Sequence, residues 1–247
     1  MVIHKRKLGL TLGVLFILLF AKLSLANEDK VYQDAMHLLE SQKYEEAIDL
    51  LKEPMNNHPD NDSYQILAAR AFEALAIEAF RDSLLSENDK TAKLDNVKEK
   101  EQYYKSKARE HYDKAIALDS KNVWAYIGRA TSSDDPAEQE FWAKQAIEKF
   151  PYTSTGAFAL LHSQYLAKAF EEKNSGNIDE ALNWLNKVKI LDAKYIERME
   201  SAPEEAFQDL FKHTSKEMNK DLFFKDLKEK SRGISNIEKE WKEKYNK

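Results

Sequence analysis

Small and large residues recur at the same offsets in four segments of the chain. In the stretch SQKYEEAIDLLKEPMNNHPDN, Ala47 is followed by Leu51 and Pro54 on one helical face, and then by Pro59. Three further segments repeat these offsets: Ala108, Tyr112, Ala115 and Ser120; Gln139, Ala143, Ala146 and Pro151; and Ala181, Leu185, Val188 and Ala193. Small residues let a second helix approach closely, and proline at the last position cannot continue the helix. The pattern therefore predicts four helices that each bury one face and end before the last residue of the set.

An apolar helix is predicted upstream of each of these four helices. The residues at its packing positions are Val31, Asp34, Ala35 and Leu38; Tyr64, Leu67, Ala68 and Ala71; Trp124, Ile127 and Gly128; and Tyr165 with Ala169. Only 6 glycines and 5 prolines interrupt 247 residues, which favours long helices. The chain is therefore predicted to be all-α and built from helical hairpins, with an irregular helical bundle as the alternative.

These residues resemble the tetratricopeptide repeat, a helix–turn–helix unit of about 34 residues. The resemblance covers residues 27–195 and is strongest in the second helices and in the stretch WAYIG at residues 124–128. It is weakest in the first unit, where Asp34 occupies a position that the family usually fills with leucine. The resemblance implies a right-handed α-solenoid of about four hairpins, because such units stack on one another.

The second hairpin is predicted to be unusually long. Ala47 and Ala108 are separated by almost twice the length of one repeat. Helix-forming residues lie on both sides of the polar stretch SENDKTAKLDN, and the second helix is expected to begin at its last residue, Asn96. Sharing the excess between two helices extends each by about 20 Å. A smaller excess before Ala181 predicts about one extra turn in each helix of the last hairpin, with Gly176 at its bend.

Residues 196–247 are predicted to form helices that cap the solenoid. The segments Ser201–Glu204 and Ser235–Glu238 each resemble a capping box, and Gly233 is expected to separate two helices. Apolar residues follow at helical spacing, namely Phe207, Leu210, Phe211, Met218 and Leu222, and then Ile237, Trp241 and Tyr245.

The concave groove of such a solenoid is the surface that the resemblance assigns to partner binding. Its candidate residues, one turn from the packing positions, are Gln65, Phe72, Tyr126, Arg129 and Phe170. Their mixed aromatic and polar character suits an extended or helical peptide, although the two phenylalanines could equally be core residues of long hairpins. The carboxylate clamp of the family, made of lysine and asparagine, is not reproduced by Gln65, Ala125 and Arg129.

The first residues have the layout of a secretory signal peptide. A basic start, His4–Lys7, precedes an uncharged apolar run from Leu8 to Ala21, and Ser24-Leu25-Ala26 offers small residues for cleavage after Ala26. Residues 1–26 are therefore predicted to be a cleaved signal, and the mature protein to be periplasmic or secreted without membrane insertion. The alternative is an uncleaved signal that anchors the chain in the inner membrane.

Catalytic, metal and cofactor signals are weak in this sequence. There is no cysteine, the six histidines have no zinc-binding spacing, and the few glycines form no phosphate-binding loop. A net charge of −5 gives no indication of nucleic-acid binding. The sequence therefore favours a non-enzymatic exported scaffold that binds a protein or peptide, without a cofactor, through its groove and its long hairpin. An accessory subunit of a cell-envelope transport or assembly complex is the alternative.

Overall fold

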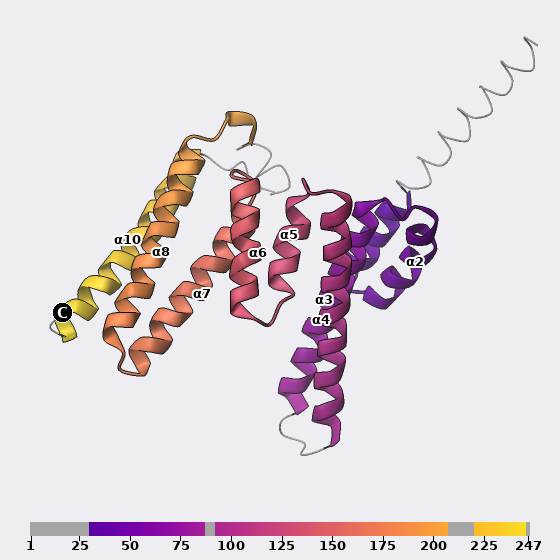
Figure 1. The fold of residues 1–247 in the computed structure, drawn as a ribbon, viewed down its shortest axis with the longest axis horizontal. Helices are drawn as coiled ribbons and strands as arrows, with labels where there is room; N and C mark the ends of the chain where they lie inside the picture. Colours follow the sequence, from indigo (N-terminus) through magenta and orange to yellow (C-terminus); the bar gives the residue numbers. More distant parts are fainter. Residues whose placement is uncertain (1–29, 87–91, 207–219, 246–247) are drawn as a thin grey trace, which may run out of the picture. The chain divides into compact units, whose positions relative to one another are not determined.

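The computed structural model describes residues 30–86, 92–206 and 220–245, and these residues are helical without any β-strand (Figure 1). The all-α prediction is therefore confirmed. The chain divides into two compact units, which comprise residues 1–120 and 121–247. The predicted boundary after residue 195 falls inside a helix of the second unit, and the predicted signal peptide lies outside the described residues.

The first unit contains a helical segment over residues 30–40, α2 (Tyr44–Asn57), α3 (Asp62–Ser86) and α4 (Ala92–Leu118). The core of its N-terminal hairpin consists of small residues packed beside larger ones. The fully or almost fully buried members are Ala35, Ala47, Leu51, Tyr64, Leu67, Ala68 and Ala71. Pro54 lies inside the last part of α2, while Pro59 follows the helix end, as the offsets predict.

The hairpin of α3 and α4 is long, as predicted, with helices of 25 and 27 residues. Helix α4 begins at Ala92, four residues before the expected Asn96, because the polar residues before Asn96 are compatible with a helix. Close approach of the two helices is allowed by Ala69 and Ala108, which are buried together with Tyr112. The tyrosine hydroxyl donates a 3.0 Å hydrogen bond to Glu73 Oε2. Helices α3 and α4 therefore lie side by side and extend past α2 (Figure 1).

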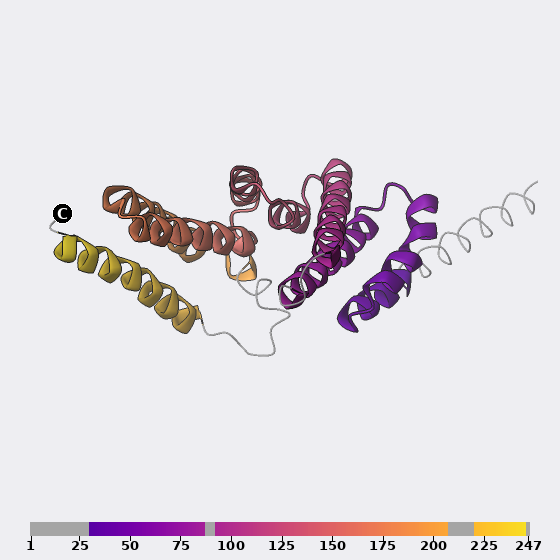
Figure 2. The ribbon, with the colours of Figure 1, turned by 90° about the horizontal axis from the view of Figure 1, so that it is seen from below.

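The second unit contains α5 (Val123–Thr131), α6 (Pro136–Lys149), α7 (Thr155–Asn174), α8 (Ile178–Glu200) and α10 (Lys220–Tyr245). Side chains cap two of these helices: Asn122 Oδ1 accepts a hydrogen bond from the Trp124 amide, and Asp135 Oδ1 accepts one from the Ala137 amide. Helices α5 and α6 form one hairpin and α7 and α8 another, and α10 packs along α8 (Figure 2).

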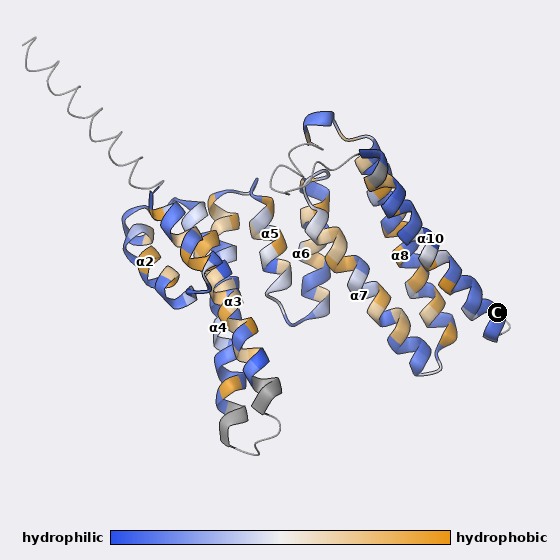
Figure 3. Cartoon of the chain, turned by 180° about the vertical axis from the view of Figure 1, so that it is seen from behind, coloured by the Kyte–Doolittle hydropathy of each residue, from blue (hydrophilic) through white to orange (hydrophobic). Residues whose placement is uncertain are grey.

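Most of the predicted packing positions are buried in both units. Asp34 is an exception and is exposed, because a carboxylate is unfavourable in an apolar core. Four alanines of the predicted packing faces have no exposed surface, namely Ala47, Ala108, Ala143 and Ala181. Their larger neighbours on the same faces, Leu51, Tyr112 and Leu185, are buried as well. Figure 3 shows hydrophobic residues interspersed with hydrophilic ones along these helices, which is the pattern of helices that bury one face.

Gly176 stands at the bend of the α7–α8 hairpin, where its φ is +83°. The amides of Gly176 and Asn177 donate to the carbonyls of Lys173 and Glu172, at 3.1 and 2.9 Å, and so satisfy the end of α7. The prediction of a glycine bend in this hairpin is therefore confirmed. The helices of this hairpin, with 20 and 23 residues, are also longer than the 9 and 14 of α5 and α6.

Several sequence predictions about single residues are wrong, among them the capping box at Ser235–Glu238, which lies inside α10. Helix α8 continues through Ala193 to Glu200, since the sequence around Ala193 has no proline or glycine to end it. Helix α10 continues through Gly233, because a single glycine weakens a helix by only about 1 kcal/mol and Ile234 and Trp241 are buried around it. Trp124 is 66% exposed rather than packed, since it lies in the first turn of a short helix.

The C-terminal apolar residues Phe207 to Met218 lie outside the described residues. None of the described helices combines the length and the apolar composition that crossing a bilayer requires.

Candidate functional site

Three of the predicted groove residues are buried within their own unit. Gln65 lies between α3 and α4, with its Oε1 atom 2.7 Å from His111 Nδ1. The hydroxyl of Tyr126 accepts a 2.8 Å hydrogen bond from Lys149 Nζ. Arg129 forms an ion pair with Glu138. These side chains therefore hold neighbouring helices together, and a role for them in partner binding stays a prediction.

The two predicted phenylalanines lie in different units and are more accessible. Phe72 is half-buried and stacks on His111, with ring centroids 5.5 Å apart and an interplanar angle of 14°. Phe170 is 37% exposed and meets Trp241 edge to face at 5.2 Å. Each ring packs within a long hairpin or against α10, as the core interpretation of these residues expects, while part of Phe170 remains in contact with solvent.

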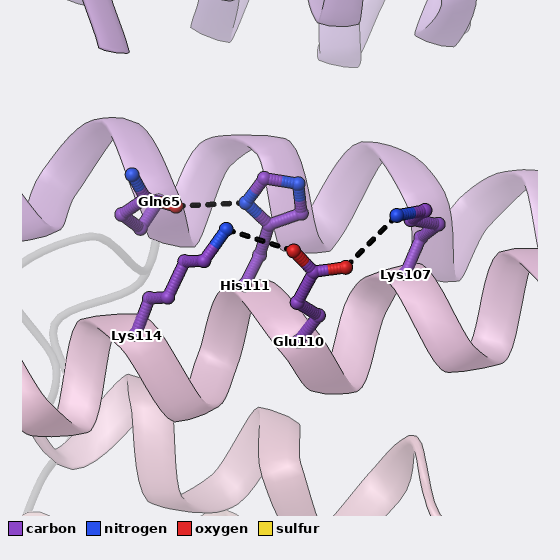
Figure 4. Close-up of polar contacts among 5 residues, drawn as sticks. All are labelled: Gln65, Lys107, Glu110, His111 and Lys114. Carbon is purple, nitrogen blue, oxygen red and sulfur yellow. Dashed lines mark hydrogen bonds and ion pairs between the residues drawn. The ribbon is translucent and has the colours of Figure 1, made fainter. Parts of the chain in front are cut away.

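A polar cluster lies where α4 packs on α3 (Figure 4). Its members are Gln65 on α3 and Lys107, Glu110, His111 and Lys114 on α4. Burial, helped by the charge of Lys114, lowers the pKa of His111 to about 4. The imidazole is therefore neutral at neutral pH, with the Nδ1 proton donated to Gln65 Oε1, because that oxygen can only accept.

Glu110 is ionised throughout the physiological range. Hydrogen bonds from Lys114 and Lys107, at 2.8 and 2.9 Å, lower the pKa of its carboxyl to about 2. These side chains are 38–51% exposed, so solvent screens the ion pairs and they contribute little to stability. Neither His111 nor Glu110 has a pKa near 7, where an acid or base catalyst works best. The cluster therefore fits the joining of α3 to α4 better than proton transfer.

A cleft of about 490 Å³ opens in the first unit where the α3–α4 hairpin passes the start of α2. Its walls combine apolar and aromatic groups, including Leu75, Val97 and Tyr104, with six charged residues. The charged residues are Glu45, Glu46, Glu78 and Asp82 against Lys43 and Lys100. Because carboxylates outnumber lysines by two, the cleft favours positively charged groups.

Large apolar side chains are exposed on the same hairpin. Exposure reaches 62% for Ile77, 48% for Phe80 and 55% for Tyr103. Sequence reasoning missed these residues, although Ile77 and Phe80 fall out of phase with the buried stripe of Leu75, Ala76 and Ala79. We call Ile77, Phe80 and Tyr103 the hairpin surface, since exposed apolar residues grouped on one element are typical of interaction sites.

The described parts of the chain contain no group of three or more acidic or histidine side chains arranged to hold a metal ion. Comparison with the models of known protein families finds no match to this chain, and neither does comparison with curated protein sequences. The candidate site is therefore defined by the cleft and the hairpin surface of the first unit alone.

Proposed function

We propose that this chain is a non-enzymatic, exported helical-repeat scaffold, similar to tetratricopeptide-repeat proteins, that binds a protein or peptide partner. The long α3–α4 hairpin is its recognition element. The partner segment lies against the hairpin surface and places basic side chains in the cleft at the hairpin base. The helical hairpins act as repeats that stack in the manner of a solenoid.

The observation that carries this proposal is the combination of exposed apolar residues on the hairpin and excess negative charge in the cleft at its base. Ile77 and Tyr103 are more than half exposed, although solvation of such side chains is unfavourable. Four carboxylates line the neighbouring cleft beside only two lysines. A partner segment with apolar residues on one face and lysine or arginine beside them would satisfy both features, as an amphipathic basic helix does.

The repeat character of the proposal is supported by the recurring buried positions. Ala47, Ala108 and Ala181 each precede a larger buried residue by four positions. Ala143 occupies the second position of its set, and all four alanines have zero exposure. Repeating units that each pack through a small residue cannot bury their apolar faces alone, and stacking on neighbours solves this problem.

The proposal is tested by placing charge on the hairpin surface. The double variant Ile77→Glu, Tyr103→Glu changes two exposed positions, so we expect its helical circular dichroism to match that of the wild type. Full-length wild type and variant, each tagged, are used to capture proteins from extracts of the source cells with quantitative mass spectrometry. We expect at least one protein retained by the wild type to be depleted about tenfold or more with the variant, equivalent to about 1.4 kcal/mol.

The matched control is Ile190→Glu in α8, an isoleucine that is 49% exposed in the second unit. This control adds one glutamate at a similarly exposed apolar position and should retain the partner. If wild type, double variant and control capture the same proteins in equal amounts, the hairpin surface is not the recognition element.

A further inference from the structure

The second unit contains a pocket that the proposed function does not use. Helix α8 lies between α7 and α10, and both flanking helices run antiparallel to it. The bend at Gly176 reverses the chain between α7 and α8. The ion pairs Lys228–Glu200 and Glu238–Lys189 occur in opposite order along α10 and α8, which shows that these two helices are antiparallel. At one end the rings of Phe170 and Trp241 bridge α7 and α10. At the other end the three helices enclose a pocket of about 390 Å³.

The walls of this pocket are mainly apolar and aromatic. Helix α7 supplies Phe158, α8 supplies Tyr195, and α10 supplies Phe223. The first two rings have centroids 4.5 Å apart, and the hydroxyl of Tyr195 is bonded to Thr155 Oγ1 at 3.2 Å, so these walls are held in place. A volume in this range, with apolar walls and a few polar groups, is typical of sites for small organic ligands.

A carboxylate lies among these apolar walls. Asp192 on α8 accepts a 2.8 Å hydrogen bond at Oδ1 from His162 Nδ1 on α7. Its second oxygen, Oδ2, is buried and has no hydrogen-bond partner among the described residues. The Asp192 side chain is 16% exposed and lines the pocket, so a ligand there can approach the carboxylate. The missing donor at Oδ2 leaves the negative charge of this carboxylate incompletely stabilised by the protein.

The remaining charges of the pocket cancel each other. Asp226 and Lys230 on α10 form an ion pair at 2.8 Å. When His162 is neutral, Asp192 therefore remains as the uncompensated charge of the lining residues. Aromatic faces attract cations as well, so the carboxylate and the rings of the walls favour the same kind of ligand.

We propose that this pocket binds a small organic ammonium compound, with the ammonium group against Asp192 and an apolar body among Phe158, Tyr195 and Phe223. The carboxylate discriminates against ligands whose head group is an anion, because two negative charges in a partly dehydrated site repel each other. The site belongs to the second unit and is independent of the hairpin surface proposed above.

Three probes of similar size, each a phenyl ring on a two-carbon chain, test the proposal: 2-phenylethylamine, 2-phenylethanol and phenylacetate. Binding of each to the full-length ¹⁵N-labelled chain is measured from amide chemical-shift changes at the lining residues. Fragments of this size bind in about the millimolar range. We expect the amine to bind about threefold to tenfold more tightly than the alcohol and the anion to bind most weakly. Equal affinities for the amine and the alcohol, or no shift at the lining residues, would overturn the proposal on the wild type alone.

Two variants assign the preference to Asp192. In Asp192→Asn, the amine should lose its advantage over the alcohol while the alcohol still binds. The matched control Asp179→Asn, at an exposed position of the same helix, should leave the advantage unchanged. An advantage that persists in Asp192→Asn would contradict the assignment. Should that variant fail to give a folded spectrum, Phe223→Ala replaces it, and unchanged binding of all three probes to Phe223→Ala would contradict the pocket.

Proton uptake by His162 supplies a further test. The charged and titratable groups that face it are Asp192 and Tyr195 on α8 and Asp226 and Lys230 on α10. The hydrogen bond to Asp192 raises the pKa of His162, so mild acid produces an imidazolium that neutralises the carboxylate. Affinity for the amine should therefore fall as the pH is lowered from 8 to 5, and His162→Gln should remove most of this fall. Amine affinity that is independent of pH in the wild type would contradict recognition by Asp192.

Discussion

The neutral, half-buried His111 makes the contact between α3 and α4 sensitive to acid. Its pKa is lowered from an ordinary value of 6.5 to about 4, first by burial and then by Lys114. An unfolded chain takes up this proton near pH 6.5, whereas the folded chain does so only near pH 4. The stability that depends on the neutral form is therefore complete above pH 6.5 and is lost as the pH falls towards 4.

The size of this effect follows from the two pKa values. At pH 5, His111 is almost fully protonated in the unfolded chain and mostly neutral in the folded chain. This difference lowers the free energy of unfolding by about 2 kcal/mol relative to pH 7. Solvent around a partly exposed imidazole screens the interaction, so we expect about 1 kcal/mol. The substitution His111→Gln retains an amide that can bond to Gln65 but cannot titrate.

Urea unfolding followed by far-UV circular dichroism measures the effect at pH 7 and pH 5. The wild type should exceed His111→Gln in stability by about 1 kcal/mol at pH 7, because the variant loses the stack on Phe72, and the difference should shrink at pH 5. The control His162→Gln should behave in the opposite way. Its imidazole pKa is raised by Asp192, so the stability that it contributes is present below pH 6.5 and is lost as the pH rises. An NMR titration that gives His111 a pKa near 6.5 would refute the reasoning. A stability difference between the wild type and His111→Gln that is equal at pH 7 and pH 5 would also refute it.

Two further predictions use matched pairs of positions. Ala181→Leu should lower the free energy of unfolding by about 1–3 kcal/mol, because Ala181 has no exposed surface. Ala193→Leu, on the exposed side of the same helix, should change it by less than about 0.5 kcal/mol. Equal urea midpoints for the two variants would contradict the close helix contact at Ala181. Gly176→Ala should lower the free energy of unfolding by about 1 kcal/mol because φ is +83° there, while Gly233→Ala, in a helix with nothing within 4 Å of the added carbon, should raise it by about 0.5–1 kcal/mol. Thermal unfolding measures both signs, and a stabilising Gly176→Ala would show that the bend is assigned incorrectly.

The packing positions could be predicted from the sequence because they depend on local spacing. Ala47 and Ala181 recur at the same offsets to Leu51 and Leu185, and helical periodicity alone places each pair on one face. The length of the α3–α4 hairpin was predictable for a similar reason, since helix-forming residues continue on both sides of one polar stretch.

The burial of Gln65 and Arg129 could not be predicted from the sequence, because it depends on partners in other helices. Gln65 is polar, so its sequence pattern predicts a surface residue. In the structure its side chain is buried and hydrogen-bonded to His111, which lies 46 positions further along the chain. Arg129 is likewise buried beside Glu138 and over the ring of Trp142. Single-sequence periodicity contains no information about such pairs, so a buried hydrogen-bonded side chain cannot be distinguished from a groove side chain.

The pocket of the second unit was missed for a different reason. Its walls come from three helices, and Phe223 lies 65 positions after Phe158. The pocket lies where α7 and α10 both pack on α8, at the opposite end of these helices from the contact between Phe170 and Trp241. No pattern within one helix predicts that arrangement.

Photo-crosslinking in the source cells tests the proposed scaffold function most directly. The photoreactive amino acid p-benzoylphenylalanine replaces Tyr103, an exposed tyrosine of the hairpin surface, and in a control chain it replaces Asp49, an exposed residue of α2. We predict that illumination joins the Tyr103 chain to a discrete protein whose contacting peptide contains apolar and basic residues, and that the Asp49 chain gives no such product. A correctly folded, normally expressed Tyr103 chain that gives no product beyond the one seen with Asp49 would contradict a partner-binding role for the hairpin.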